Sequence, residues 1–401
     1  MAALKKNPSS RAKLTTGQRK VILARHSLGE GGKKKTKVVV RRKTAVKKAV
    51  AKKKTSPLEL RKSQKNPIIE PERSAYWESK ATFNPSAVYS DGKVHVIYRA
   101  IGDSDISVLG YARSDNGYLF DKNSKKIAYY QKGKFAVRKD AVKINYISGG
   151  GWGGGCEDPR LTLLSDKVYM LYTAFDGWGS VRIALTSISL DDFIGRRFDW
   201  KEPVLISPPG EIHKNWVLFP EKIKGKYAIL HSISPHIMID YFSSLDELDG
   251  ENFIHSVHQG SSLWSARDRL IRGVGPAPIK TKYGWLVLYH KMEKHDSHRY
   301  KLWAMILDLK DPAKILYNSR HPILEPDEWY ENEGYKAGVV YACGAVVKPA
   351  RPDDSSRSGG DELFVYYGGA DKVSCVATAN LDAFLKELVY SGASKLKSRK
   401  S

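Results

Sequence analysis

The sequence predicts an all-β protein, a five-bladed β-propeller with a disordered basic N-terminal tail and a short C-terminal helix. Three observations predict this fold. Five stretches of the chain share one internal order, helical periodicity is nearly absent before residue 380, and most of the net positive charge precedes the first of the five stretches. A propeller is built from such repeats, each forming a blade of about four strands.

The first 55 residues are strongly basic. They hold 19 lysines and arginines and one acid, Glu30, so 18 of the 24 net positive charges lie there. The stretch KKKTKVVVRRKTAVKKAVAKKK (33–54) has low complexity and no aromatic residue, and such a composition does not bury enough apolar surface to fold. We therefore expect residues 1–66 to be a disordered tail that contacts nucleic acid or another polyanion. The alternative is a solvated extension without a partner.

The body of the chain, residues 67–392, contains the repeats. Each begins with a proline, continues through an apolar strand and a tight turn, and ends in an alternating strand. The five copies are NPSAVYSDGKVHVIYRA (84–100), DPRLTLLSDKVYMLYTA (158–174), FPEKIKGKYAILHSIS (219–234), APIKTKYGWLVLYHKM (277–292) and GAVVKPARPDDSSRSGGDELFVYYGGA (344–370). The shared order favours a propeller over the alternative, unrelated hairpins in a β-sandwich.

The last predicted element is a helix over NLDAFLKELVYS (380–391), which has apolar residues at helical spacing and Asn380 as an N-cap candidate. A short basic tail, residues 393–401, follows it.

The composition excludes several classes of protein. The three cysteines are too widely spaced for a zinc site or a disulfide framework, so we expect no metal. No apolar run reaches the length of a membrane span, and the start does not resemble a secretory signal. We therefore expect a cytoplasmic protein.

The stretch GGGWGGGCEDPR (149–160) places a bare backbone directly before a dense cluster of charge. Glycines let the chain pass over the mouth of a channel without side chains that block a ligand, so we expect a flexible lid. A plain connecting loop is the alternative.

Polar residues recur near the starts of the repeats, and the innermost strands of a propeller surround one channel. Each of these residues has an ordinary structural interpretation by itself, such as a turn, an ion pair or a satisfied core histidine. Taken together, they are expected to converge on one pocket. They are Asn84, Arg99, Glu157, Asp158, Arg160, Glu221, His290 and Asp371.

Several motifs resemble those of glycoside hydrolase family 130, the β-mannoside phosphorylases and related β-mannosidases. The matching stretches cover nearly all of residues 70–385 in order, and the resemblance implies a five-bladed propeller. They include CEDPRLT (156–162), KNWVLFPEKIKGKY (214–227), GVGPAPIKTKYGWLVLYHK (273–291) and LFVYYGGAD (363–371).

The resemblance implies an inverting glycoside phosphorylase that needs no cofactor beyond inorganic phosphate as co-substrate. It implies that Asp158 is the general acid, donating a proton through a mannose hydroxyl while phosphate attacks the anomeric carbon and releases mannose 1-phosphate. A neighbouring Glu157 or a closed pocket is expected to keep Asp158 protonated. Sugar binding is assigned to Asn84, Arg99, Glu157 and Asp371, with Tyr335 or Tyr367 as an aromatic face.

Phosphate needs cations to hold it. The resemblance places two of the expected basic residues at Lys214 and His290. Ser232 stands where the phosphorylases carry an arginine, and Arg272 lies beside a lysine position that is out of register.

Hydrolysis instead needs a second carboxylate to activate water. The matching positions are Glu221 and, with slipped spacing, Asp268. We prefer the phosphorylase interpretation and retain an inverting β-mannosidase as the alternative. A non-catalytic carbohydrate-binding propeller is a second alternative, against which the intact EDPR motif speaks. An arabinanase-type hydrolase lacks carboxylates at enough repeat starts, and a nucleic-acid-binding protein rests on the tail alone.

Overall fold

The computed structural model describes residues 58–122, 124–132, 136–137, 153–257, 270–350 and 360–392. The basic N-terminal tail up to residue 57 and the tail 393–401 lie outside this part of the chain, and so do residues 149–152 of the glycine run predicted as a lid. The described residues form mostly β-strands with few helices, which confirms that part of the prediction.

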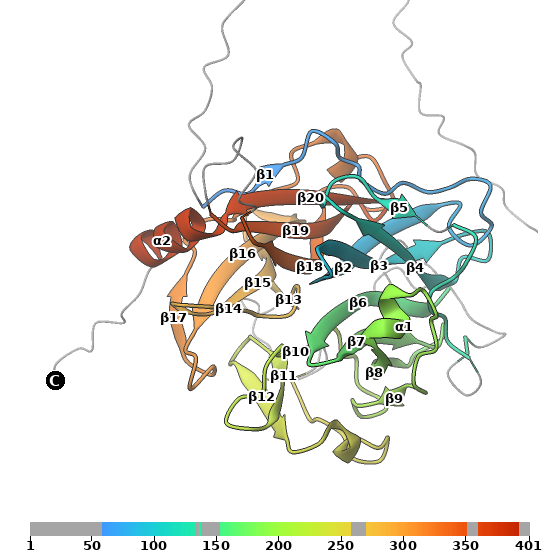
Figure 1. Cartoon of the computed structure of the whole chain (residues 1–401), viewed down its shortest axis with the longest axis horizontal. Helices are drawn as coiled ribbons and strands as arrows, with labels where there is room; N and C mark the ends of the chain where they lie inside the picture. Colours follow the sequence, from blue (N-terminus) through green and yellow to red (C-terminus); the bar gives the residue numbers. More distant parts are fainter. Residues whose placement is uncertain are drawn as a thin grey trace, which may run out of the picture. The chain divides into compact units, whose positions relative to one another are not determined.

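The first two repeats form two antiparallel groups of strands (Figure 1). A single parallel bridge between Ser107 and Gly155 joins the groups into one eight-stranded sheet. The strands are β2 (Ala81–Ser90), β3 (Lys93–Ile101), β4 (Ser107–Ser114) and β5 (Asp121–Lys122), then β6 (Gly155–Leu164), β7 (Lys167–Phe175), β8 (Val181–Ser189) and β9 (Val204–Leu205).

The remaining repeats form three further antiparallel sheets. The first contains β10 (Val217–Leu218), β11 (Tyr227–Ser232) and β12 (Met238–Phe242). The second contains β13 (Ile271–Val274), β14 (Ile279–Thr281), β15 (Gly284–Glu293), β16 (Asp296–Leu307) and β17 (Ile315–Asn318). The third contains β18 (Val340–Lys348), β19 (Glu362–Gly369), β20 (Val373–Asn380) and β1 (Arg61–Lys62).

Four of the five predicted repeats overlap a pair of antiparallel neighbours, and in the third the first strand of the pair, β10, ends just before the repeat begins at Phe219. These pairs are β2–β3, β6–β7, β10–β11, β14–β15 and β18–β19. The first and last repeats also meet, because a Cβ at Gly344 of β18 would lie 2.6 Å from the backbone nitrogen of Ala87 in β2. Short turn residues and period-two alternation therefore located the hairpins correctly.

The helices are few and short. The predicted C-terminal helix is present as α2 (Leu381–Ser391), and the Asn380 side chain caps it by accepting from the Ala383 N–H at 2.9 Å. In the described part of the chain the other elements of this kind are α1 (Leu190–Ile194), η3 (Leu245–Glu247) and η5 (Trp329–Glu331). Among the described residues, no helix has both the length and the apolar composition for crossing a membrane.

The folded part begins before the predicted boundary at residue 67. Strand β1 pairs with β20, and Leu58 and Leu60 are buried in the same apolar cluster as Leu385. The Leu60 N–H also donates to the Ile323 carbonyl at 2.9 Å. The sequence did not indicate this segment, because two leucines in a polar stretch show no clear period, and their burial depends on partners more than 200 residues away.

Candidate active site

Two β-bulges at equivalent places shape the site. The register of β2 against β3 shifts across Asn84–Pro85, and that of β6 against β7 shifts across Asp158–Pro159. Asn84 and Asp158 both adopt a φ of 50°. A positive φ is uncommon for any residue other than glycine, and a residue before proline usually has an extended backbone. A bulge re-aims a side chain that would otherwise follow the strand. The recurring NP and DP dipeptides therefore mark the same kind of β-bulge in two repeats.

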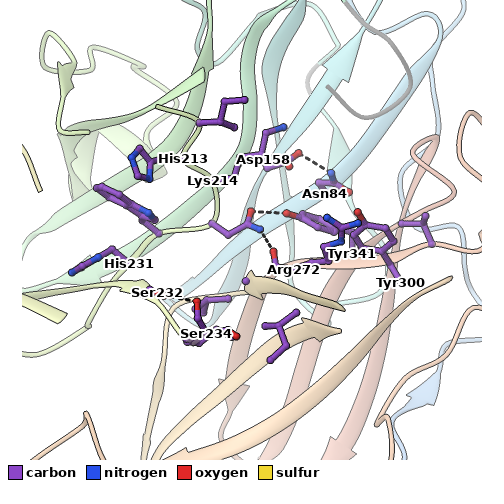
Figure 2. A pocket seen from close by; sticks show the side chains of 18 of the residues that line it. Asn84, Asp158, His213, Lys214, His231, Ser232, Ser234, Arg272, Tyr300 and Tyr341 are labelled. Carbon is purple, nitrogen blue, oxygen red and sulfur yellow. Dashed lines mark hydrogen bonds between the residues drawn. The ribbon is translucent and has the colours of Figure 1, made fainter. Parts of the chain in front are cut away.

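These side chains meet in a pocket with a volume of about 210 Å³ (Figure 2). Of the sequence-predicted site residues, five line it. They are Asn84, Arg99, Asp158, Lys214 and Asp371. The prediction that distant repeats contribute to one pocket agrees with this placement.

Asp158 is held at the pocket wall by two donors. The Asn84 Nδ2 group donates to its Oδ1 at 2.7 Å, and the Arg99 Nη1 group lies 3.3 Å from the same oxygen. Burial raises the pKa of Asp158, but the positive charges of Arg99, Lys214 and Arg160 outweigh it, so the pKa lies below its usual value. The expected raised pKa of Asp158 is therefore not found.

Glu157 lies behind the pocket rather than in its lining. Its side chain is fully buried, with Oε1 3.1 Å from Arg99 Nη2 and Oε2 3.0 Å from Lys214 Nζ. It therefore orients two cations whose other sides face the pocket. Such a buried carboxylate compensates their charges while keeping both side chains in place.

Asp371 comes from the turn between β19 and β20, with a φ of 53°. Burial raises its pKa, Lys336 and Arg99 oppose that rise, and the negative charge of Asp158 adds to it. The two carboxyl groups of the pocket are thus shifted in opposite directions. At any given pH Asp371 is the more readily protonated of the two.

Arg160 organises the backbone beneath the site. Its fully buried guanidinium donates to the carbonyl oxygens of Asp158 at 2.7 Å and Gly275 at 3.0 Å, and to Asn215 Oδ1 at 2.8 Å. Asn215 Oδ1 also accepts from the Tyr341 hydroxyl at 2.6 Å. Arg160 therefore joins the strand of Asp158 to two other strand groups.

Two cations in the pocket contact the same aromatic ring. The Arg272 guanidinium lies 5.5 Å from the centre of the Tyr300 ring, and Lys336 Nζ lies 4.3 Å from it. All three residues line the pocket. Among the described residues neither cation forms an ion pair, and the buried Arg272 Nε has no hydrogen-bond partner. Two positive charges in one pocket favour the binding of an anion there.

His290 is not among the residues that line the pocket, contrary to its predicted contact with phosphate. It is completely buried, and its Nε2 accepts from the Ala342 N–H at 2.9 Å. Burial, with the nearby Arg160, lowers its pKa to about 3, so the ring is neutral. It stacks on Tyr341 with ring centres 4.1 Å apart and thereby supports a residue that does line the pocket.

The candidate bases for hydrolysis are not found in the pocket. Glu221 is half-exposed and pairs with Lys280 at 2.5 Å on the surface. Asp268 lies outside the described residues. Ser232 lines the pocket, but its hydroxyl donates to the Ser234 carbonyl at 3.1 Å and carries no charge (Figure 2).

Sequence reasoning missed a second wall of aromatic rings. Trp216 lies between His213 and His231, with ring centres 5.1 Å and 5.5 Å away, and all three line the pocket. The sequence signal for His213 and Trp216 was their closeness to the predicted site residue Lys214. Consecutive residues of this irregular segment all line the pocket. Of the two tyrosines expected as sugar platforms, Tyr367 is fully buried, whereas Tyr335 is 47% exposed beside the pocket residue Lys336.

No group of three or more histidine, cysteine, aspartate or glutamate side chains in the described part of the chain is arranged to hold a metal ion. The three cysteines are buried and free.

Comparisons with known proteins find relatives of this chain among the β-mannoside phosphorylases. A family profile described as β-1,4-mannooligosaccharide phosphorylase matches residues 51–389. A 1,2-β-oligomannan phosphorylase of Thermoanaerobacter sp. (strain X514) is 35% identical over 80% of this chain and 97% of its own length. A β-1,2-mannobiose phosphorylase of the same organism is 32% identical over 76% and 92%. The solved β-1,2-mannobiose phosphorylase of Listeria innocua, in complex with β-1,2-mannobiose, shares the fold, with a TM-score of 0.58, 24% identity and coverage of 82% and 99%.

Proposed function

The chain belongs to glycoside hydrolase family 130, and from this premise we propose that it is an inverting phosphorylase of β-mannosides that transfers mannose to inorganic phosphate. The products are mannose 1-phosphate and a shortened mannoside. The two relatives of 35% and 32% identity that cover 80% and 76% of the chain are both named for β-1,2-linked substrates, so we propose β-1,2-linked mannosides as its substrates.

The five strand groups are proposed to be the blades of a closed propeller. The position of β18 against β2 supports closure, since it brings the last group beside the first. The pairing of β1 with β20 adds a strand from the start of the folded chain to the last sheet. In such a ring the starts of the innermost strands face one channel, where Asn84 and Asp158 lie.

Asp158 is proposed as the general acid, and Asn84, Arg99 and Asp371 as groups that bind the mannosyl ring. Their hydrogen bonds and charges suit the hydroxyl groups of a sugar. Protonation of the glycosidic oxygen breaks its bond to the anomeric carbon, while a phosphate oxygen forms the new bond from the opposite face. The proton stays on the leaving sugar.

The observation that carries this proposal is the pair of cations over Tyr300. Arg272 and Lys336 lie in the same pocket as Asp158, and together with Lys214 they supply the positive charge that a phosphate dianion needs. Arg272 thereby takes the part of the arginine that Ser232 replaces. Hydrolysis uses water and a carboxylate base, so it does not require this cluster of cations.

Replacing Arg272 by alanine is expected to raise the KM for phosphate by roughly tenfold to a hundredfold, the equivalent of one charge-assisted hydrogen bond. The KM for the mannoside changes much less, since other residues, Asn84, Arg99 and Asp371, are the groups proposed to bind the sugar. Initial rates at varied phosphate and varied mannoside measure both constants. Lys280→Ala is the matched control, because it removes a surface cation that pairs with Glu221. Equal changes in both KM values would contradict the assignment.

Bound phosphate is expected to raise the pKa of Asp158, because a dianion offsets the cations that lower it. A general acid must be protonated, so its activity falls as the pH rises through its pKa. The alkaline limb of kcat at saturating phosphate should therefore lie at higher pH than the limb of kcat/KM for phosphate. Full pH profiles measure both limbs. Coincident limbs, or a reversed order, would refute this electrostatic role of phosphate.

A further inference from the structure

The pocket is too small for a whole oligosaccharide. Its volume of about 210 Å³ is below the roughly 300–1,000 Å³ of pockets that enclose drug-sized ligands. The proposed reaction fills it with one mannosyl ring and a phosphate. The sugars on the leaving side must therefore lie on the surface around the opening.

One large aromatic side chain lies at the end of the strands where Asp158 is placed. Trp178 is 52% exposed in the turn between β7 and β8. Strand pairing sets Phe175 of β7 opposite Gly155 of β6, three residues before Asp158, and Trp178 lies three residues beyond Phe175. At about 3.3 Å per residue, Gly155 is already roughly 10 Å from Asp158 along the strand.

The turn that carries Trp178 is held in one conformation. Asp176 Oδ1 accepts from three successive backbone N–H groups, those of Trp178, Gly179 and Ser180, at 2.9, 3.0 and 2.9 Å. A ring on a fixed turn binds a ligand with little loss of conformational entropy.

Two glycines before Asp158 allow close approaches of the backbone, Gly154 to this turn and Gly155 to Ser107. A Cβ at Gly154 would lie 2.8 Å from the backbone nitrogen of Gly177, and one at Gly155 would lie 2.2 Å from the Ser107 carbonyl oxygen. Both glycines also have a positive φ, of 120° and 102°. No side chain of these two residues therefore separates the turn from the strand of the general acid.

The same turn borders the lining of the pocket. The His213 N–H donates to the carbonyl of Val181, which follows the turn, at 3.1 Å. Ile212, which lines the pocket, packs with Phe175 and Val181 on either side of the turn. The residues on either side of the Trp178 turn therefore contact the pocket wall.

We propose that Trp178 is the platform on which the second sugar of the leaving group, and those beyond it, stack in longer oligomannosides. The inference rests on the proposed action on β-mannosides and adds that longer chains are the preferred substrates. The first leaving sugar lies next to Asp158, too near to reach this ring, so a disaccharide does not use it. The apolar face of a pyranose ring matches the flat face of an indole.

Calorimetric binding of β-1,2-mannobiose and β-1,2-mannotetraose to the full-length protein tests this directly. Both are measured in an Asp158→Asn background, which prevents turnover. The parent should bind the tetrasaccharide more tightly than the disaccharide. Trp178→Ala should weaken tetrasaccharide binding by roughly threefold to tenfold, the contribution of one aromatic stack, and change disaccharide binding by less than about twofold. Trp178→Phe should retain most of the difference.

Tyr390→Ala is the matched control, because it removes an 88% exposed ring from α2 and should change neither affinity. Trp178→Gln repeats the test should the alanine variant fail to fold. Equal affinity of the parent for the two sugars, or an equal loss for both, overturns the proposal. Binding is independent of the chemistry, so a protein that forms no mannose 1-phosphate but shows this pattern refutes the proposed function and leaves the platform intact.

Discussion

Replacing Asp158 by asparagine lowers turnover on an unactivated mannoside by about 10²-fold to 10⁴-fold, the usual contribution of a general acid. Asparagine has the same shape as aspartate and can occupy the same position in the β6 bulge. Its amide, however, has no acidic proton to donate. The carboxylate oxygen that accepts from Asn84 at 2.7 Å is matched by the amide oxygen. The fold should therefore be retained, and initial rates of sugar release measure the loss.

A mannoside with a very good leaving group separates protonation from binding. Such a leaving group departs without a proton, so the variant should recover most of its rate on it. Glu221→Gln is the control, because it makes the same chemical change at a half-exposed carboxylate outside the pocket. Near-normal activity of Asp158→Asn on an unactivated mannoside would exclude Asp158 as the donor. A severe loss in Glu221→Gln would instead favour the hydrolytic alternative.

Replacing Arg160 by methionine lowers the free energy of unfolding by about 3–5 kcal/mol, as expected when one partner of a buried charged network is removed. The carbonyl oxygens of Asp158 and Gly275 and the Asn215 side chain then lose their donor while they stay buried. Because these groups belong to different strand groups, the pocket should open and activity should be lost with stability. Urea unfolding measures the difference.

The control for this change is an exposed arginine. Arg197 is 62% exposed and pairs with Asp192 at 2.6 Å, and its replacement by methionine should cost no more than about 1 kcal/mol. Arg160→Lys retains the positive charge but loses the planar set of guanidinium donors. Its loss in free energy of unfolding should therefore lie between those of Arg160→Met and Arg197→Met. A stable, active Arg160→Met protein would show that the network beneath the site is dispensable.

The sequence predicted the strands well because their signals are local. Turn residues and period-two alternation located the hairpins, and the N-cap and apolar spacing located α2. The dipeptides NP and DP drew attention to Asn84 and Asp158. The sequence did not reveal that both residues lie in bulges with positive φ, since that geometry depends on the pairing of β2 and β6 with their neighbours.

The site residues that the sequence did not predict correctly depend on contacts between distant parts of the chain. His290 carries the right motif, but its neutral ring lies against Tyr341 inside the protein, and whether a strand residue faces the channel depends on a register that the motif does not encode. Lys336 was overlooked because its segment matches no repeat. Its relation to Arg272 arises only through the shared ring of Tyr300.

The most direct test of the central claim is to follow the sugar products by ³¹P and ¹H nuclear magnetic resonance. Full-length protein is incubated with β-1,2-, β-1,3- or β-1,4-linked mannosides, with and without phosphate. We predict that α-mannose 1-phosphate, the inverted product, forms only when phosphate is present, and fastest from the β-1,2-linked substrate. Release of free mannose at the same rate without any phosphate would contradict the assignment of this pocket to phosphorolysis.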